Sequence, residues 1–128
     1  MNTSLQCAIA AFLLFIGVAF GAFGAHALNG LVDVGMMAVW HTAVLYLLIH
    51  GLGLFVLAVA TPYLVVRLQN LAYSLLLIGT MLFSGSLFLL VLSGQSWLGA
   101  ITPIGGIFML GGWIMTAVAA MQKLRQYK

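Results

Sequence analysis

The chain has 128 residues, of which 65% are hydrophobic and only 4% are charged, and its mean hydropathy is +1.25. A soluble domain keeps roughly a quarter of its residues charged, so this composition excludes a water-facing surface and indicates a membrane protein in contact with the lipid bilayer. The formal net charge of +3 does not indicate a nucleic-acid partner, because three of the four basic residues lie in the last six positions, as in a membrane-flanking tail.

Four apolar segments are long enough to cross a bilayer, which takes about 20 residues in helical form. Each lacks Asp, Glu, Lys and Arg. Asn29-Gly30 and Thr61-Pro62 break the chain after the first two segments, and Thr102-Pro103 has the pattern of an N-cap and first-turn proline for the fourth. We therefore predict an all-α membrane protein with a single domain over residues 1–128 and spans at about 5–28, 38–60, 69–92 and 102–121.

The first segment ends in "GAFGAHAL" (21–28), where Ala25-His26-Ala27 imitates the cleavage site of a secretory signal peptide. Residues 1–10 carry no Lys or Arg, however, and the apolar stretch exceeds the usual length of about 7–15 residues. We therefore expect this segment to be a retained helix.

The loops between the four segments are short, so consecutive helices are expected to be antiparallel neighbours in a four-helix transmembrane bundle. This topology puts both termini and the central loop on one side, together with all the basic residues. The positive-inside rule then places the N and C termini in the cytoplasm. Trp40 and Trp97 fall at the opposite interface and Tyr63 and Tyr127 at the cytoplasmic one, as in an aromatic belt.

Small residues recur at helical spacing in the first and fourth segments. Helices in lipid associate through close backbone approach at such residues and through interhelical hydrogen bonds. We favour packing inside one bundle, and a homo-oligomer interface is the alternative. The predicted helix-packing residues are Gly17, Gly21, Gly24, Ala25, Gly105 and Gly112.

His50, near the middle of the second segment, is the deepest titratable group. It follows Thr42 and Tyr46 at a spacing of four residues, which gives the helix a polar stripe. Thr80 has a similar depth on the third segment and is, by topology alone, a candidate partner of His50. Two interpretations are open: a neutral histidine that fixes the register of two helices, which we favour, or a proton relay or anchor for a lipid or quinone headgroup. The candidate polar pocket consists of His50, Tyr46, Thr42, Thr80, Ser84 and Ser86.

His26 and His41 form a second candidate site toward the opposite face. Asp33 and two methionines lie between them, and such side chains can bind copper or, through the histidines, a haem. The spacing matches no established ligand pattern, so we expect these imidazoles to meet headgroups and water, with no metal and no cofactor. Asp33 is also the only carboxylate side chain, and no nucleophile has a plausible base. We expect no enzyme activity.

Several motifs resemble a family of small membrane proteins known as domain of unknown function 423, which is related to the eukaryotic transmembrane protein 256. They are "GAFGAHAL" (21–28), "WHTAVLYLLIH" (40–50), "LFSGSLFLL" (82–90), "GAITPIGG" (99–106) and "GGW" (111–113). The motif positions are His26, Trp40, Thr42, Tyr46, His50, Ser84, Gly85, Ser86, Thr102, Pro103 and Gly105. His41 stands where the family more often has Glu, Gln or Lys, which weakens a shared metal site with His26.

The resemblance implies a four-helix, multi-pass protein of the bacterial inner membrane and brings no established activity with it. Our leading expectation is a non-catalytic structural or accessory module that packs against itself as a homo-oligomer or against a larger membrane complex. The alternatives are a small-molecule or proton-linked transporter or channel, and a lipid- or quinone-binding protein, each using the polar pocket around His50. A transporter requires a water-accessible route to His50, whereas an accessory module does not.

Overall fold

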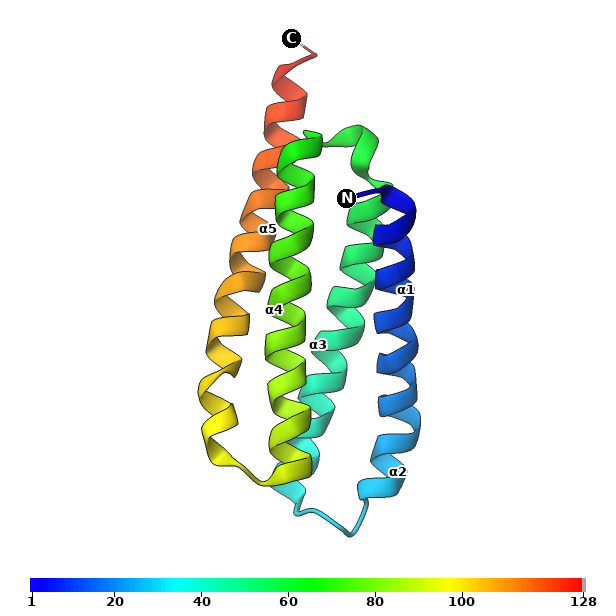
Figure 1. Cartoon of the computed structure of the whole chain (residues 1–128), viewed down its shortest axis with the longest axis vertical. Helices are drawn as coiled ribbons and strands as arrows, with labels where there is room; N and C mark the ends of the chain where they lie inside the picture. The colour runs from blue at the N-terminus through cyan, green and yellow to red at the C-terminus, as the bar shows by residue number, and fades with distance from the viewer. Residues whose placement is uncertain (128) are drawn as a thin grey trace.

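The computed structural model describes residues 1–127, apart from the side chain of Ala25, and the regular secondary-structure elements of this range are all helices (Figure 1). The elements are α1 (Thr3–Ala19), the π-helix η1 (Phe20–Gly24), α2 (Ala25–Leu28), α3 (Val34–Val59), the short helix η2 (Thr61–Tyr63), α4 (Val66–Ser93), the short helix η3 (Ser96–Ala100) and α5 (Thr102–Arg125). Four helical segments are long and apolar enough to cross a membrane, at Thr3–Leu28, Val34–Val59, Val66–Ser93 and Ser96–Arg125. This confirms the predicted all-α fold class.

Local side-chain chemistry sets the helix ends. The Asp33 carboxylate accepts a hydrogen bond from the Met36 backbone N–H at 2.8 Å and so caps α3. Gly94 ends α4 in the left-handed conformation, with φ of 71°, which favours glycine. The prediction that Thr102 caps the fourth helix is wrong: α5 begins at Thr102 itself, and its hydroxyl lies 2.7 Å from the Ser86 hydroxyl of α4.

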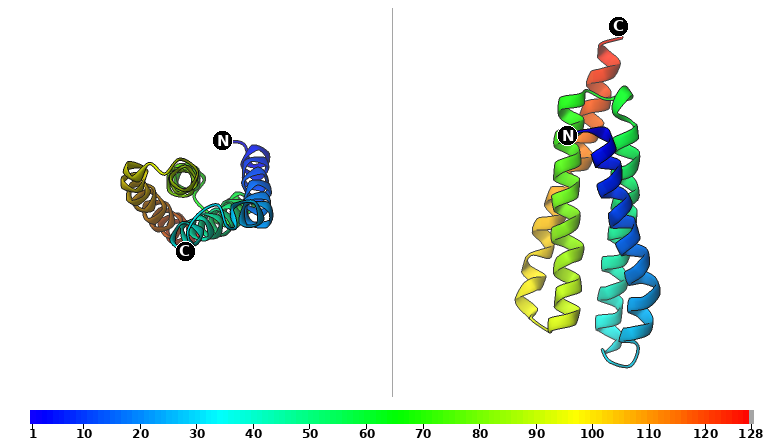
Figure 2. Two further views of the ribbon diagram at one scale, coloured as in Figure 1. Left: turned by 90° about the horizontal axis from the view of Figure 1, so that it is seen from below. Right: turned by 45° about the vertical axis from the view of Figure 1, so that its right-hand side comes forward.

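Contacts between the helices follow the order of the chain. The α1 helix packs on α3, α3 on α4, and α4 on α5, the last being the most extensive contact. Viewed along the long axis, α1 and α5 lie on opposite sides, with α3 and α4 between them (Figure 2). Both termini and η2 lie at one end of the molecule, and the other two connections lie at the opposite end (Figure 1).

A buried polar cluster joins α1, α3 and α4 near the end that holds the termini. Gln69 donates from its amide nitrogen to the Gln6 side-chain oxygen at 2.9 Å and to the Leu57 carbonyl at 3.2 Å. Gln6 donates in turn to Asn70 at 2.9 Å, and the Tyr73 hydroxyl donates to the Gln6 backbone carbonyl at 2.6 Å. Such hydrogen bonds fix the register of helices that have no hydrophobic force to hold them together in lipid.

The π-helix η1 makes the first span irregular at the sequence "FGAFG" of residues 20–24. The Phe20 carbonyl, in this irregular turn, accepts a hydrogen bond from the Trp40 indole N–H of α3 at 3.0 Å. The Phe88 ring of α4 completes the contact, with ring centroids 4.9 Å from Phe20 and 4.7 Å from Trp40. Gly24 lies against the Trp40 ring: a Cβ at this position would come within 2.5 Å of it.

Candidate functional site

His50 is buried in α3 and uses both of its ring nitrogens. Its Nδ1 lies 2.9 Å from the backbone carbonyl oxygen of Tyr46, one turn earlier. Its Nε2 accepts a hydrogen bond from the indole N–H of Trp113, on α5, at 3.2 Å. Because an indole N–H can only donate, this contact requires the neutral imidazole with its proton on Nδ1. The histidine therefore links α3 to α5.

Aromatic rings surround the imidazole. The Tyr46 ring stacks on His50 with centroids 5.7 Å apart and on Phe83 of α4 with centroids 4.3 Å apart. These three side chains and Trp113 border a pocket of about 250 Å³, whose other walls come from α5. Gly106 forms part of those walls, and no atom lies within 4 Å of the position that its Cβ would take. The pocket therefore combines flat aromatic surfaces with the polar groups of Tyr46 and His50.

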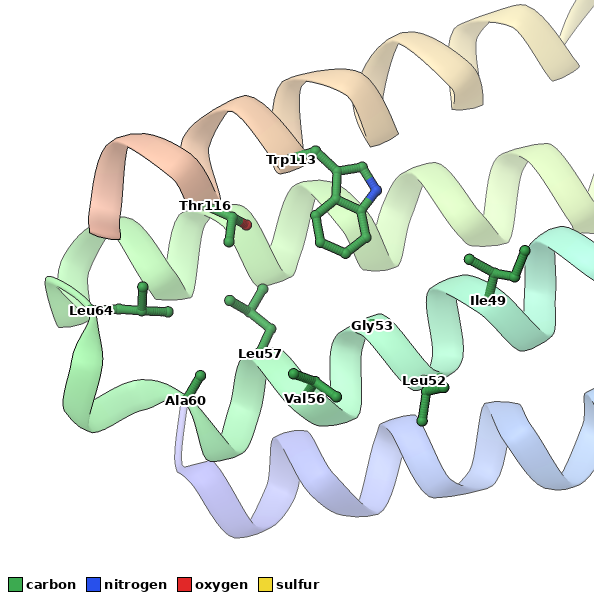
Figure 3. A pocket seen from close by; sticks show the side chains of 9 residues that line it. All are labelled: Ile49, Leu52, Gly53, Val56, Leu57, Ala60, Leu64, Trp113 and Thr116. Carbon is green, nitrogen blue, oxygen red and sulfur yellow. The ribbon is translucent and has the colours of Figure 1, made fainter. Parts of the chain in front are cut away.

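Trp113 separates this pocket from a second, apolar groove between α3 and α5. The groove has a volume of about 360 Å³ and extends from the indole toward η2 (Figure 3). Gly53 of α3 makes room for the indole, since a Cβ there would lie 2.9 Å from the Trp113 ring. The remaining lining residues are Ile49, Leu52, Val56, Leu57, Ala60, Leu64 and Thr116.

The structure does not gather the whole predicted polar pocket around His50. Thr80 is fully buried, but its hydroxyl donates to the Leu76 carbonyl of its own helix at 2.7 Å, so the candidate pairing of Thr80 with His50 does not form. Thr42 is exposed and donates to the Ala38 carbonyl. Thr42 and His50 are eight residues apart, whereas two helical turns take only about 7.2 residues. Thr42 is therefore rotated away from the face on which His50 lies, and it points outward.

The two predicted serines join helices at other places. The Ser84 hydroxyl donates to the Ala43 carbonyl of α3 at 2.8 Å. The Ser86 hydroxyl lies 2.7 Å from the Thr102 hydroxyl, at the start of α5. These contacts hold α4 between its two neighbours and do not extend the pocket at His50.

His26 and His41 are both exposed, and Asp33 between them is engaged as the cap of α3. Within residues 1–127, no group of three or more His, Cys, Asp and Glu side chains is placed to hold a metal ion. The His26–His41 pair therefore has no third ligand of these types among the described residues.

Each described member of the predicted glycine set faces a neighbouring helix of the same chain. A Cβ at Gly105 would lie 2.5 Å from the Phe83 backbone nitrogen, and one at Gly112 would lie 2.6 Å from the Leu76 side chain. The side chain of Ala25, also predicted for packing, lies outside the described part of the structure. The other described members of the set are Gly17, Gly21 and Gly24, which face Leu48, Val44 and Trp40 of α3.

Sequence reasoning missed Trp113 as the partner of His50, and it missed the Gln6–Gln69 cluster. A usable pattern exists for the second. Glutamines rarely lie at membrane depth, and antiparallel helices bring residues 6 and 69, near the starts of the first and third spans, to the same end. No comparable pattern identifies Trp113.

We expect Trp113→Phe to lower the free energy of unfolding by about 1 kcal/mol, because it leaves Nε2 of a buried imidazole without a donor. The measurement is thermal unfolding in detergent, followed with a thiol-reactive fluorophore that reports exposure of Cys7, the single cysteine. In a His50→Phe background the same substitution should cost less. Equal costs in both backgrounds would show that the hydrogen bond contributes nothing.

The fold and the site define a class: a small multi-pass α-helical membrane protein whose interior polar groups bond to one another. The profile of the family described as "Protein of unknown function (DUF423)" matches residues 20–106. The chain belongs to this family, for which no catalytic activity is indicated.

Named relatives support the same assignment. The chain is 44% identical over 114 residues to UPF0382 membrane protein YwdK of Bacillus subtilis (strain 168), which covers 85% of this chain and 89% of the relative. It is 40% identical over 114 residues to UPF0382 membrane protein SH2409 of Staphylococcus haemolyticus (strain JCSC1435), which covers 89% and 93% of the two chains. No solved structure matches the chain.

Proposed function

We propose that this membrane protein is a non-catalytic module, a structural or accessory component that packs with other membrane proteins or with its own copies. The observation that carries the proposal is the closed polar interior. Both ring nitrogens of His50, the Ser84 hydroxyl and the Gln69 amide nitrogen bond to another helix or to backbone carbonyls. Within residues 1–127, no buried side-chain nitrogen or oxygen lacks a hydrogen-bond partner. Such an interior holds helices in place and offers no free acid or base.

The proposed location is the bacterial inner membrane, with both termini in the cytoplasm. Two observations support this orientation. Arg67 is the second residue of α4 and Arg125 is the last residue of α5, so both cations lie at the end of the molecule that also holds the termini (Figure 1). Asp33 lies in a connection at the opposite end. Short loops that carry an excess of Arg and Lys are retained on the cytoplasmic side of the membrane.

The second candidate function is transport, or the binding of a lipid or quinone headgroup, at the pocket beside His50. The observation in its favour is the pocket itself, about 250 Å³ between α3, α4 and α5, with aromatic walls and an imidazole. Transport through it would require a ligand or water to displace the Trp113 indole from His50, since both imidazole nitrogens are engaged.

Cysteine accessibility separates the two functions. In a Cys7→Ala background, we expect Tyr46→Cys and His50→Cys to be protected from a membrane-impermeant thiol reagent added to either side. Gln95→Cys, in the exposed connection between α4 and α5, is the positive control and should react from one side. Reaction at position 46 or 50 would reveal an aqueous route and contradict the proposed function.

Native mass spectrometry of the gently solubilised chain tests the accessory role directly. The expected result is a fixed stoichiometry, either with a partner protein or with further copies of the chain. A purely monomeric chain would contradict the proposal, and a retained quinone lost on Tyr46→Leu would favour the second candidate.

A further inference from the structure

A groove runs between α1 and α4 on the side of the molecule away from the His50 pocket. The two helices are joined at the Gln6–Asn70 hydrogen bond, where the start of α1 lies beside α4 (Figure 2, right). Beyond that point they separate and leave two adjoining hollows of about 530 and 230 Å³. The hollows share the residues Leu13, Ile16 and Met81, so they form one continuous groove.

The surface of this groove is apolar along its whole length. Among the described residues that line it, only Thr80 and Ser84 carry hydroxyl groups, and both hydroxyls donate to backbone carbonyls. Gly85 keeps the groove open, because no atom lies within 4 Å of the position that its Cβ would take. A concave apolar surface on a membrane-embedded helix pair fits a hydrocarbon chain.

Beyond the end of the groove nearest the termini, past its last lining residues Ala8 and Leu77, the surface becomes polar and carries a positive charge. Asn70 lies there and accepts from the Gln6 amide. Arg67, which is exposed, precedes Gly85 by 18 residues, and at 3.6 residues per turn this is about five full turns. The two residues therefore lie on the same face of α4, with the guanidinium at the interfacial end and the apolar groove below it.

We propose that this groove retains one acyl chain of an anionic phospholipid, with the lipid phosphate bound by Arg67. A guanidinium matches phosphate oxygens with two parallel hydrogen bonds, and a cation at the interface attracts anionic lipid by about 1 kcal/mol. The arrangement of charge above an apolar groove is complementary to the phospholipid, whose anionic headgroup and hydrocarbon chain follow the same order.

The test of the charged end uses the purified full chain after lipid removal, titrated with phosphatidylglycerol or phosphatidylcholine and followed by native mass spectrometry. Arg67→Gln should weaken phosphatidylglycerol binding about fivefold and leave phosphatidylcholine binding unchanged. Arg125→Gln is the matched control, because it removes one exposed cation at the same end but on α5. Equal losses of phosphatidylglycerol binding in the two variants would show that binding depends only on net charge, and this result would overturn the proposal.

The apolar part is tested by filling the groove from either wall. Gly85→Leu on α4 and Ala8→Leu on α1 should each weaken binding of both lipids, while the thermal unfolding of the lipid-free chain stays within a few degrees of the parent. Unchanged phosphatidylglycerol binding in both filled variants would place the lipid elsewhere and overturn the proposal. If one variant fails to fold, the other still decides the outcome.

Discussion

Gly105→Ala is expected to lower the free energy of unfolding by about 3 kcal/mol, a large effect for one methyl group. The added Cβ would lie 2.5 Å from the backbone nitrogen of Phe83 and 2.7 Å from the backbone carbonyl oxygen of Gly79. Neither atom belongs to a flexible side chain, so α5 would have to move away from α4 along the most extensive helix contact in the molecule. Thermal unfolding with the Cys7 fluorophore measures the loss.

The adjacent glycine provides a matched control. Gly106→Ala introduces the same methyl group at the next residue, where no atom lies within 4 Å. Alanine is the better helix former by about 1 kcal/mol, so Gly106→Ala should leave the stability unchanged or raise it slightly. Similar destabilisation by the two substitutions would refute close packing at Gly105 and would indicate a general requirement for glycine in this turn.

This pair of glycines also marks a limit of what the sequence can predict. Spacing by seven residues correctly indicates that Gly105 and Gly112 share a face of the helix, because helical periodicity is a local property. Which of two adjacent glycines points at α4 depends on the rotation of α5 about its own axis. That rotation is set by the facing groove on α4, which the local sequence of α5 does not contain.

The spans themselves could be predicted well, because about 20 consecutive apolar residues have few alternatives in a lipid bilayer. The third span begins at Val66, not near residue 69, and the fourth continues to Arg125, beyond residue 121. Arg125 and Lys123 lie in the last turn of α5, where cations interact favourably with the helix dipole, so the helix extends past its apolar part.

The candidate site was only partly predictable. The depth of His50 could be counted from the chain, and its need for a partner follows from burial in an apolar span. The choice between Thr80 and Trp113 could not be made in the same way. Both reach the interior at compatible depths, but the hydroxyl of Thr80 is satisfied within its own helix, whereas the Trp113 indole N–H reaches across to α3.

Gly24→Ala is the second substitution with a large expected effect, about 2 kcal/mol of lost stability. Its Cβ would lie 2.5 Å from Cζ2 and 2.7 Å from Nε1 of Trp40, a rigid ring held by its hydrogen bond to the Phe20 carbonyl and by contacts with the Phe20 and Phe88 rings. Displacing the ring would break the hydrogen bond to the Phe20 carbonyl and disturb the contact with Phe88. Gly85→Ala, with open space at its Cβ, is the control and should have no such cost.

A second background shows whether the Trp40 ring is the cause. Trp40→Leu removes the ring and will itself destabilise the chain, because a buried indole and its hydrogen bond are lost. In that background Gly24→Ala no longer meets an aromatic ring, so its additional cost should fall to less than half of its cost in the parent. An unchanged cost would mean that Gly24 is required by the π-helix backbone of η1 and not by Trp40, because the two explanations differ only in their dependence on the indole.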